Sequence, residues 1–269
     1  MSAFKACLKK DMLEMLRTKK LWIFLGLSVA MMAFAAVMFL FMDAVVADGG
    51  SAGLTQEELD SLAATFKANY LNSIMFFSSF MSTYFVLVVI ILIAKIIPKE
   101  IKNKQWINPI SAGIKPQQII ASKIIVTVAT VFVTALIGCV LHLIFTVCCC
   151  APEGATVGTL IYSYVMLLVY ILFFAICSIS LSAICKRTWL TILILLGSLI
   201  LLPDMLSAVV LEGGYTLGAY TPFLFGSEAM VPMYVTFTPA VWVVSVLLTV
   251  GISAGLIVWA ILSNKIKSE

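Results

Sequence analysis

The chain has 269 residues, of which 62% are hydrophobic and only 11% charged, and its formal net charge is +4. Soluble domains carry about a quarter charged residues, so this composition excludes an ordinary soluble protein. Apolar runs of about 18 residues or more are typical of membrane spans, and this chain has several. We therefore expect an all-α, polytopic integral membrane protein.

Residues 3–20 are predicted to form an amphipathic helix ahead of the first apolar run. Apolar residues recur there at helical spacing, namely Phe4, Leu8, Met12, Met15 and Leu16. Lysines occupy the other face, and a basic amphipathic helix of this kind lies in the membrane interface. The alternative is a basic flank that only fixes the topology.

Six apolar runs predict six transmembrane helices within a single membrane domain over residues 1–269. The runs lie at about 21–46, 70–97, 119–149, 157–185, 188–211 and 238–262. The first run is too long for a cleaved signal peptide and no small-residue cleavage site follows it, so we interpret it as a permanent span.

The distribution of lysine and arginine predicts the orientation. Of the 17 basic residues, all but Lys67 lie in the N-terminal segment, around the turns after the second and fourth runs, or in the C-terminal tail. Segments rich in lysine and arginine stay on the cytoplasmic side. Both termini are therefore predicted to be cytoplasmic, and residues 48–67 external.

The polar insert "KEIKNKQWINPISAGIKPQQIIASK" between the second and third runs contains an elbow, predicted at residues 98–118. Pro98 suits the first turn of a short helix, on which Glu100 and Lys104 would face each other at i,i+4. Asn108 precedes Pro109 and should end that helix, because a residue before proline disfavours the helical region.

Pro116 is expected to start the next helix, which continues into the third span. The predicted elbow is thus helix, break, helix, with Trp106, Ile107 and Ile110 on an exposed apolar edge. Such an edge suits a socket on a partner protein. A plain basic loop is the alternative.

Two features of the later runs predict polar or irregular segments within the depth of the membrane. Asp204 follows Pro203 inside the fifth run, and ionisable residues at such depth usually face a cavity or a partner. Alternatively, Pro203 ends the span early and Asp204 meets water. Residues 212–237 are too rich in glycine and proline to span, and we expect an outer re-entrant hairpin or an ordinary surface loop.

Most kinds of enzymatic site are absent from the sequence. His142, the only histidine, lacks the partners of a metal site or a catalytic triad, so we expect a satisfied intramembrane side chain rather than a proton carrier. The adjacent Cys148, Cys149 and Cys150 point about 100° apart on a helix and are interpreted as packing residues. No phosphate-binding loop occurs, so we expect neither an intrinsic enzyme nor a bound metal or cofactor.

The insert resembles the corresponding segment of ABC-2-type transporter permeases, the membrane subunits of ABC exporters. In that family a glutamate after the second span precedes a leucine-rich stretch, a small-residue and proline segment, and a lysine that opens the third span. Glu100, "WINPISAGIKPQQIIASK" and Lys123 match this layout. The stretch "KNKQ" at residues 102–105 departs from it, since the family commonly has Gly-Thr there.

The resemblance implies a permease subunit of an ATP-driven exporter in a cell membrane, expected to be a bacterial plasma membrane. The implied partners are a cytosolic ATPase subunit that holds ATP and magnesium, a second permease subunit in a homo- or heterodimer, and membrane lipid, with no nucleic acid. Small six-span members resemble permeases for export of, or immunity to, peptide antibiotics, so a peptide antibiotic or another amphipathic compound is the expected substrate.

The candidate sites follow from these expectations. Coupling to the ATPase is assigned to Glu100, Lys104, Trp106, Pro109 and Pro116. Asp204 and His142 are the candidates for the translocation path. Two other classes remain open, namely a secondary carrier or channel, and a membrane sensor or assembly protein without transport.

Overall fold

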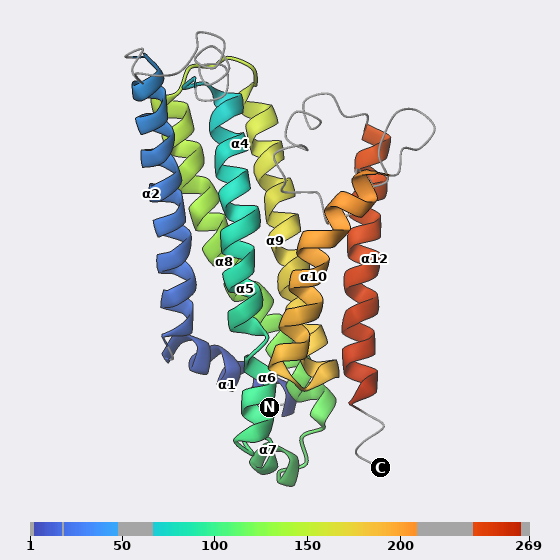
Figure 1. Ribbon diagram of the computed structural model, residues 1–269. Coiled ribbons are helices and arrows are strands. Elements are labelled where there is room, and N and C mark those ends of the chain that lie inside the picture. Colours follow the sequence, from blue (N-terminus) through green and yellow to red (C-terminus); the bar gives the residue numbers. More distant parts are fainter. Residues whose placement is uncertain (1–2, 18, 48–66, 209–238, 265–269) are drawn as a thin grey trace.

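The computed structural model describes residues 3–17, 19–47, 67–208 and 239–264 as a bundle of long helices (Figure 1). The longest elements are α2 (Lys20–Ala47), α8 (Pro116–Cys149), α9 (Val157–Cys185) and α12 (Pro239–Ser263). Shorter elements are α1 (Ala3–Arg17), α4 (Tyr70–Phe80), η1 (Met81–Phe85), α5 (Val86–Ile93), α6 (Ile96–Lys102), α7 (Ile107–Ser111) and α10 (Thr188–Ser207). In this part of the chain every element is helical, which confirms the all-α class.

Five helical segments are long and apolar enough to cross a membrane. They are Leu21–Val45, Tyr70–Lys102, Pro116–Cys149, Val157–Cys185 and Val243–Ser263. The chain therefore has the character of a membrane protein. The fifth predicted run is occupied by α10, whose described apolar part, Thr188–Leu202, is shorter, so the sixth span stays a prediction.

The helix α9 forms the centre of the bundle. It packs against α8, α5, α6, α10 and α12 and buries more of its length than any other candidate span. Its aromatic residues Phe173 and Phe174 are fully buried. Ser178 and Ser182 donate to carbonyls of the preceding turn, at 2.6 Å to Phe174 and 2.8 Å to Ile179, so no water is needed to satisfy these hydroxyls.

The second candidate span is not a regular α-helix throughout. A π-helical turn, η1, separates α4 from α5 near the middle of the bundle. Met81 and Phe85, at the two ends of this turn, are completely buried. The wider turn interrupts the 3.6-residue period, and the amino-acid pattern gave no sign of it.

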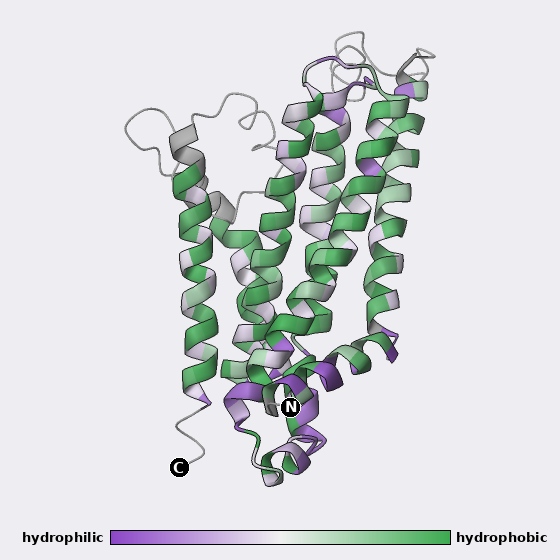
Figure 2. Ribbon diagram, turned by 180° about the vertical axis from the view of Figure 1, so that it is seen from behind, coloured by the Kyte–Doolittle hydropathy of each residue, from purple (hydrophilic) through white to green (hydrophobic). Residues whose placement is uncertain are grey.

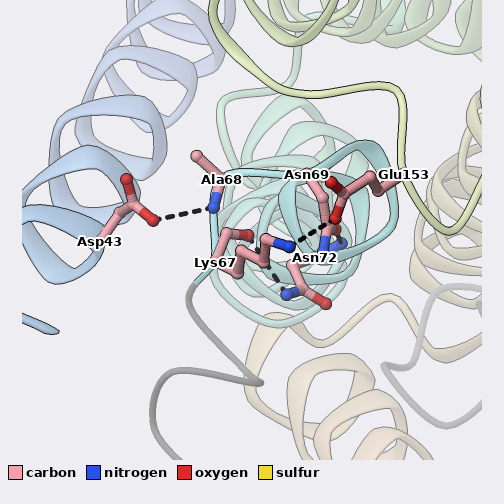
Figure 3. A network of polar contacts seen from close by, with 6 residues as sticks. All are labelled: Asp43, Lys67, Ala68, Asn69, Asn72 and Glu153. Atoms are coloured by element: carbon pink, nitrogen blue, oxygen red, sulfur yellow. Dashed lines mark hydrogen bonds and ion pairs between the residues drawn. The ribbon is translucent and has the colours of Figure 1, made fainter. Parts of the chain in front are cut away.

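The polar residues gather at the two ends of the bundle, and the end that carries α1, α6 and α7 is the more hydrophilic (Figure 2). We call it the α1 end. The opposite end is held by a small network around residues 67–72 (Figure 3). There Asp43 of α2 accepts from the Ala68 amide at 2.8 Å, and Lys67 pairs with Glu153 at 2.6 Å. Both side chains of that ion pair are more than half exposed, so it contributes little stability.

The helix α1 runs across the α1 end and packs against α8 (Figure 1). Its protein-facing side consists of Cys7, Asp11 and Met15, which are buried at i,i+4 spacing. Met12 and Leu16 are exposed, so only part of the expected apolar face contacts the protein. The helix is where the pattern placed it, while its position in the membrane interface stays a prediction.

The elbow differs from the expectation in three details. First, α6 begins at Ile96 and ends at Lys102, and Lys104 lies beyond it in the left-handed region, with φ 57°. The predicted helical pair of Glu100 with Lys104 is therefore wrong. Second, Asn108 and Pro109 lie inside α7 rather than ending a helix, because proline is tolerated in a first turn.

The third difference concerns Trp106, which is not on an exposed edge. Its side chain is partly buried against the core, whereas Ile107 and Ile110 are 56% and 44% exposed. Gly113, with φ 82°, makes the turn after α7. The prediction that Pro116 starts the helix that continues through the third span is confirmed.

Candidate functional site

A buried lysine at the α1 end collects three carboxylates. The Lys123 Nζ lies 2.6 Å from Glu100 Oε1, 2.8 Å from Asp11 Oδ1 and 3.6 Å from Glu14 Oε2. The side chains of Lys123, Asp11 and Glu100 are each less than a tenth exposed. We call these four residues the Lys123 cluster.

The cluster joins three elements that are distant in sequence. Lys123 lies in the second turn of α8, Glu100 in α6, and Asp11 and Glu14 in α1. Buried charges are costly unless they are paired and hydrogen-bonded. Ser122 also donates to Asp11, which supplies part of that compensation.

Trp106 extends the cluster into the elbow. Its indole N–H donates to Glu100 Oε2 at 3.1 Å, while Glu100 Oε1 contacts Lys123. Both carboxylate oxygens of Glu100 are thus engaged, one by α8 and the other by the turn before α7. A movement of the elbow must therefore break one of these contacts or carry α8 with it.

A cavity of about 160 Å³ lies between α1 and the elbow, beside the Lys123 cluster. Cys7, Lys10, Trp106, Pro109 and Ile114 are among its lining residues. Burial raises the pKa of the Cys7 thiol above its ordinary value, and the nearby negative charge of Asp11 acts in the same direction. The cavity is lined by both α1 and the elbow, so its size depends on the distance between them.

The predicted coupling residues separate into two groups. Glu100, Trp106 and Pro109 lie in or beside the cluster and its cavity. Lys104 is exposed in the turn outside α6, and Pro116 lies at the first position of α8. The structure thus brings three of the five together.

Of the two candidates for a translocation path, the structure describes the side chain of His142 but not that of Asp204. His142 is buried, stacks on Phe77 with ring centroids 4.0 Å apart, and shares a 2.7 Å hydrogen bond with Tyr164. Thr146 lies 3.4 Å from the same nitrogen and bonds onward to Ser73 at 2.9 Å. These contacts engage the Nδ1 atom of the ring inside the bundle.

Asp204 belongs to α10, which continues past Pro203 to Ser207, so Pro203 does not end this helix. The Asp204 side chain lies outside the described residues, as does the predicted hairpin at 212–237. The path therefore stays a prediction. The described ranges contain no group of three or more His, Cys, Asp or Glu side chains that could hold a metal ion.

Asp11 and Glu14 were missed by reasoning from the sequence. The sequence does contain a weak signal for them. They are the acids of an otherwise basic helix, and Asp11 is four residues from both Cys7 and Met15. An acid on an apolar stripe indicates a buried cationic partner, because an unpaired carboxylate would not stay ionised there. The sequence does not say which lysine that partner is.

The chain was compared with protein-family models, curated proteins and solved structures, and none of the three comparisons found a match.

Proposed function

We propose that the chain is the membrane permease subunit of an ATP-driven ABC exporter and that the elbow couples it to a separate ATPase subunit. One observation carries this proposal: the elbow is fixed to α8 and α1 by the buried Lys123 cluster. A segment projecting beyond the apolar bundle can drive a span only when it is held in this way. A plain basic loop would not need a buried ion pair.

The proposal gives different tasks to the two sides of the elbow. Glu100 and Trp106 face inward and transmit displacement to Lys123. Ile107 and Ile110 face outward and are the apolar side chains available to a partner. Lys104 is exposed between α6 and α7, and it would form an ion pair with an acidic residue of the partner.

The long helices supply the remaining parts of the proposal. The helices α2 and α12 keep large exposed apolar faces, which include Phe34 and Phe41 on α2 and Leu247 and Trp259 on α12. We assign these faces to membrane lipid and to a second permease subunit. The path would lie at that subunit contact, and a peptide antibiotic or another amphipathic compound would be its substrate.

The test is co-purification of the complex from its native membrane in mild detergent, with the ATPase subunit recognised by azido-ATP photolabelling. The paired change Ile107→Ala and Ile110→Ala should reduce recovery of the labelled subunit and substrate-stimulated ATP hydrolysis. Loss of apolar anchors of this kind typically costs about 2 kcal/mol, or roughly thirtyfold in affinity.

The matched control changes two isoleucines with similar exposure on other helices. Ile144 and Ile161 are 55% and 50% exposed, so the pair Ile144→Ala and Ile161→Ala removes the same groups away from the elbow. Recovery of the ATPase at the control level from the elbow variant would contradict the proposal. It would leave a carrier, a channel or a non-transporting sensor as the alternatives.

A further inference from the structure

A basic groove lies at the α1 end, between the α5–α6 junction and the turn that joins α9 to α10. Its volume is about 600 Å³. Cationic side chains from both elements line it, namely Lys95, Lys99, Lys102, Lys186 and Arg187. Its described lining contains no acidic side chain. The groove therefore holds a concentrated positive potential that favours an anion.

Local structure explains why the cations converge. Lys95, Lys99 and Lys102 follow i, i+4, i+7 spacing, so they share one side of the α5–α6 segment, and all three are exposed. Lys186 ends α9 in the left-handed region, with φ 54°, and Arg187 follows it in the tight turn before α10. Two elements more than 80 residues apart thus point their charges into one groove, unlike a single solvated helix face.

An apolar strip continues from the groove along α10. Trp189 and Ile192 also line the groove, together with Pro98 and Thr188, and Trp189 is 62% exposed. Leu193 and Ile200, which are 63% and 65% exposed, lie on the same side of α10 at spacings of four and eleven residues from Trp189. A free inorganic anion would contact only the cations of the groove. An amphiphile with an anionic head would contact both the cations and the apolar strip along α10.

We propose that this groove binds the headgroup of an anionic phospholipid, with the phosphate among Lys99, Lys186 and Arg187 and the acyl chains along the exposed side of α10. Basic pockets between helices at the cytoplasmic surface recognise headgroups in this way, and tryptophan suits the headgroup level. The proposal does not rest on transport or on an ATPase partner, so it stands or falls separately from the proposed function.

The experiment titrates the purified full-length protein with dioctanoyl phosphatidylglycerol and follows binding by native mass spectrometry and thermal stabilisation. Dioctanoyl phosphatidylcholine and inorganic phosphate are titrated in parallel. We expect the anionic lipid to bind at least tenfold more tightly than either. Each removed cation should weaken it by about fivefold, and the triple change Lys99→Gln, Lys186→Gln and Arg187→Gln by on the order of a hundredfold.

Lys115→Gln is the matched control, because Lys115 is exposed and does not line the groove. It should leave lipid binding unchanged. If the triple variant does not remain monodisperse, Arg187→Gln alone decides, since Arg187 is exposed. Three results would overturn the proposal: equal binding of phosphatidylcholine, equal saturation by inorganic phosphate, or wild-type affinity in the groove variants.

Discussion

Within the described ranges, Lys123 is the only cation that pairs with the two buried carboxylates of Asp11 and Glu100. Lys123→Met preserves most of the side-chain volume but leaves both acids without their partner. Removing one member of a buried ion pair typically costs about 3–5 kcal/mol, because an uncompensated charge stays behind. For a chain of this size we expect the apparent melting temperature in detergent to fall by roughly 10 °C.

Two further variants separate the charge effect from a packing effect. Lys115→Met removes an exposed lysine and should not change the melting temperature. The triple change Asp11→Asn, Glu100→Gln and Lys123→Met removes all three charges while keeping acceptors for Ser122 and Trp106. It should recover at least half of the loss. A melting temperature as low as that of Lys123→Met would show that the ion pairs are not the cause.

For single residues, the sequence indicated which side chains belong to the site but not which residues they pair with. It singled out Glu100 and Trp106, and both lie in the site. It paired Glu100 with Lys104, because i,i+4 spacing is the relation that helical periodicity reveals. The actual partner, Lys123, is 23 positions away. The choice between the two lysines depends on where α6 ends, and boundaries are the least certain part of such a prediction.

Among the elements, the contact between α1 and the elbow is the one most open to a direct measurement. Cys7 of α1 and Trp106 of the elbow both line the 160 Å³ cavity. Because burial raises the Cys7 pKa, less of its thiol is ionised near neutral pH than in an exposed cysteine. Its alkylation by maleimide should therefore be slow, increase with pH, and stay below that of an exposed thiol until the pH exceeds the raised pKa.

Trp106→Ala should accelerate Cys7 alkylation at least tenfold, since it enlarges the cavity and removes the indole contact to Glu100. Peptide-level mass spectrometry measures the rate at Cys7 without removal of the other cysteines. Trp259→Ala is the control, because Trp259 is 56% exposed on α12 and should not affect Cys7. Equal rates in both variants would mean that the elbow does not close this cavity.

The positions of the long helices could be predicted, because hydropathy determines them: a backbone in lipid must satisfy its own hydrogen bonds. The internal form of the second span could not. Its π-helical turn at η1 carries Ser82 and Thr83, but serines also occur in the regular helix α4, so these hydroxyl residues do not mark the change of period. The position of Asn108 and Pro109 inside α7 was also missed, because Pro109 fits the first turn of a helix as well as a helix end.

For the whole molecule, the two ends of the bundle differ in the depth of their polar contacts. The network of Lys67 and Glu153 is solvent-exposed and fastens connecting segments. The Lys123 cluster is buried and fastens α1, α6 and α8 together. Strain applied to the elbow would therefore pass into the centre of the bundle through α8, which packs against α9. This difference supports our proposal that an ATPase partner acts on the α1 end.

The orientation of the molecule can be tested through the same two ends. Lys67, which pairs with Glu153 (Figure 3), is the only basic residue of the described ranges that lies away from the α1 end. Since lysine and arginine remain cytoplasmic, the α1 end should face the cytosol. A membrane-impermeant maleimide added to intact cells should label Glu153→Cys, whereas Asn103→Cys should react only after permeabilisation. Peptide-level readout separates both from native Cys148 and Cys149, and labelling of Asn103→Cys in intact cells would reverse the topology.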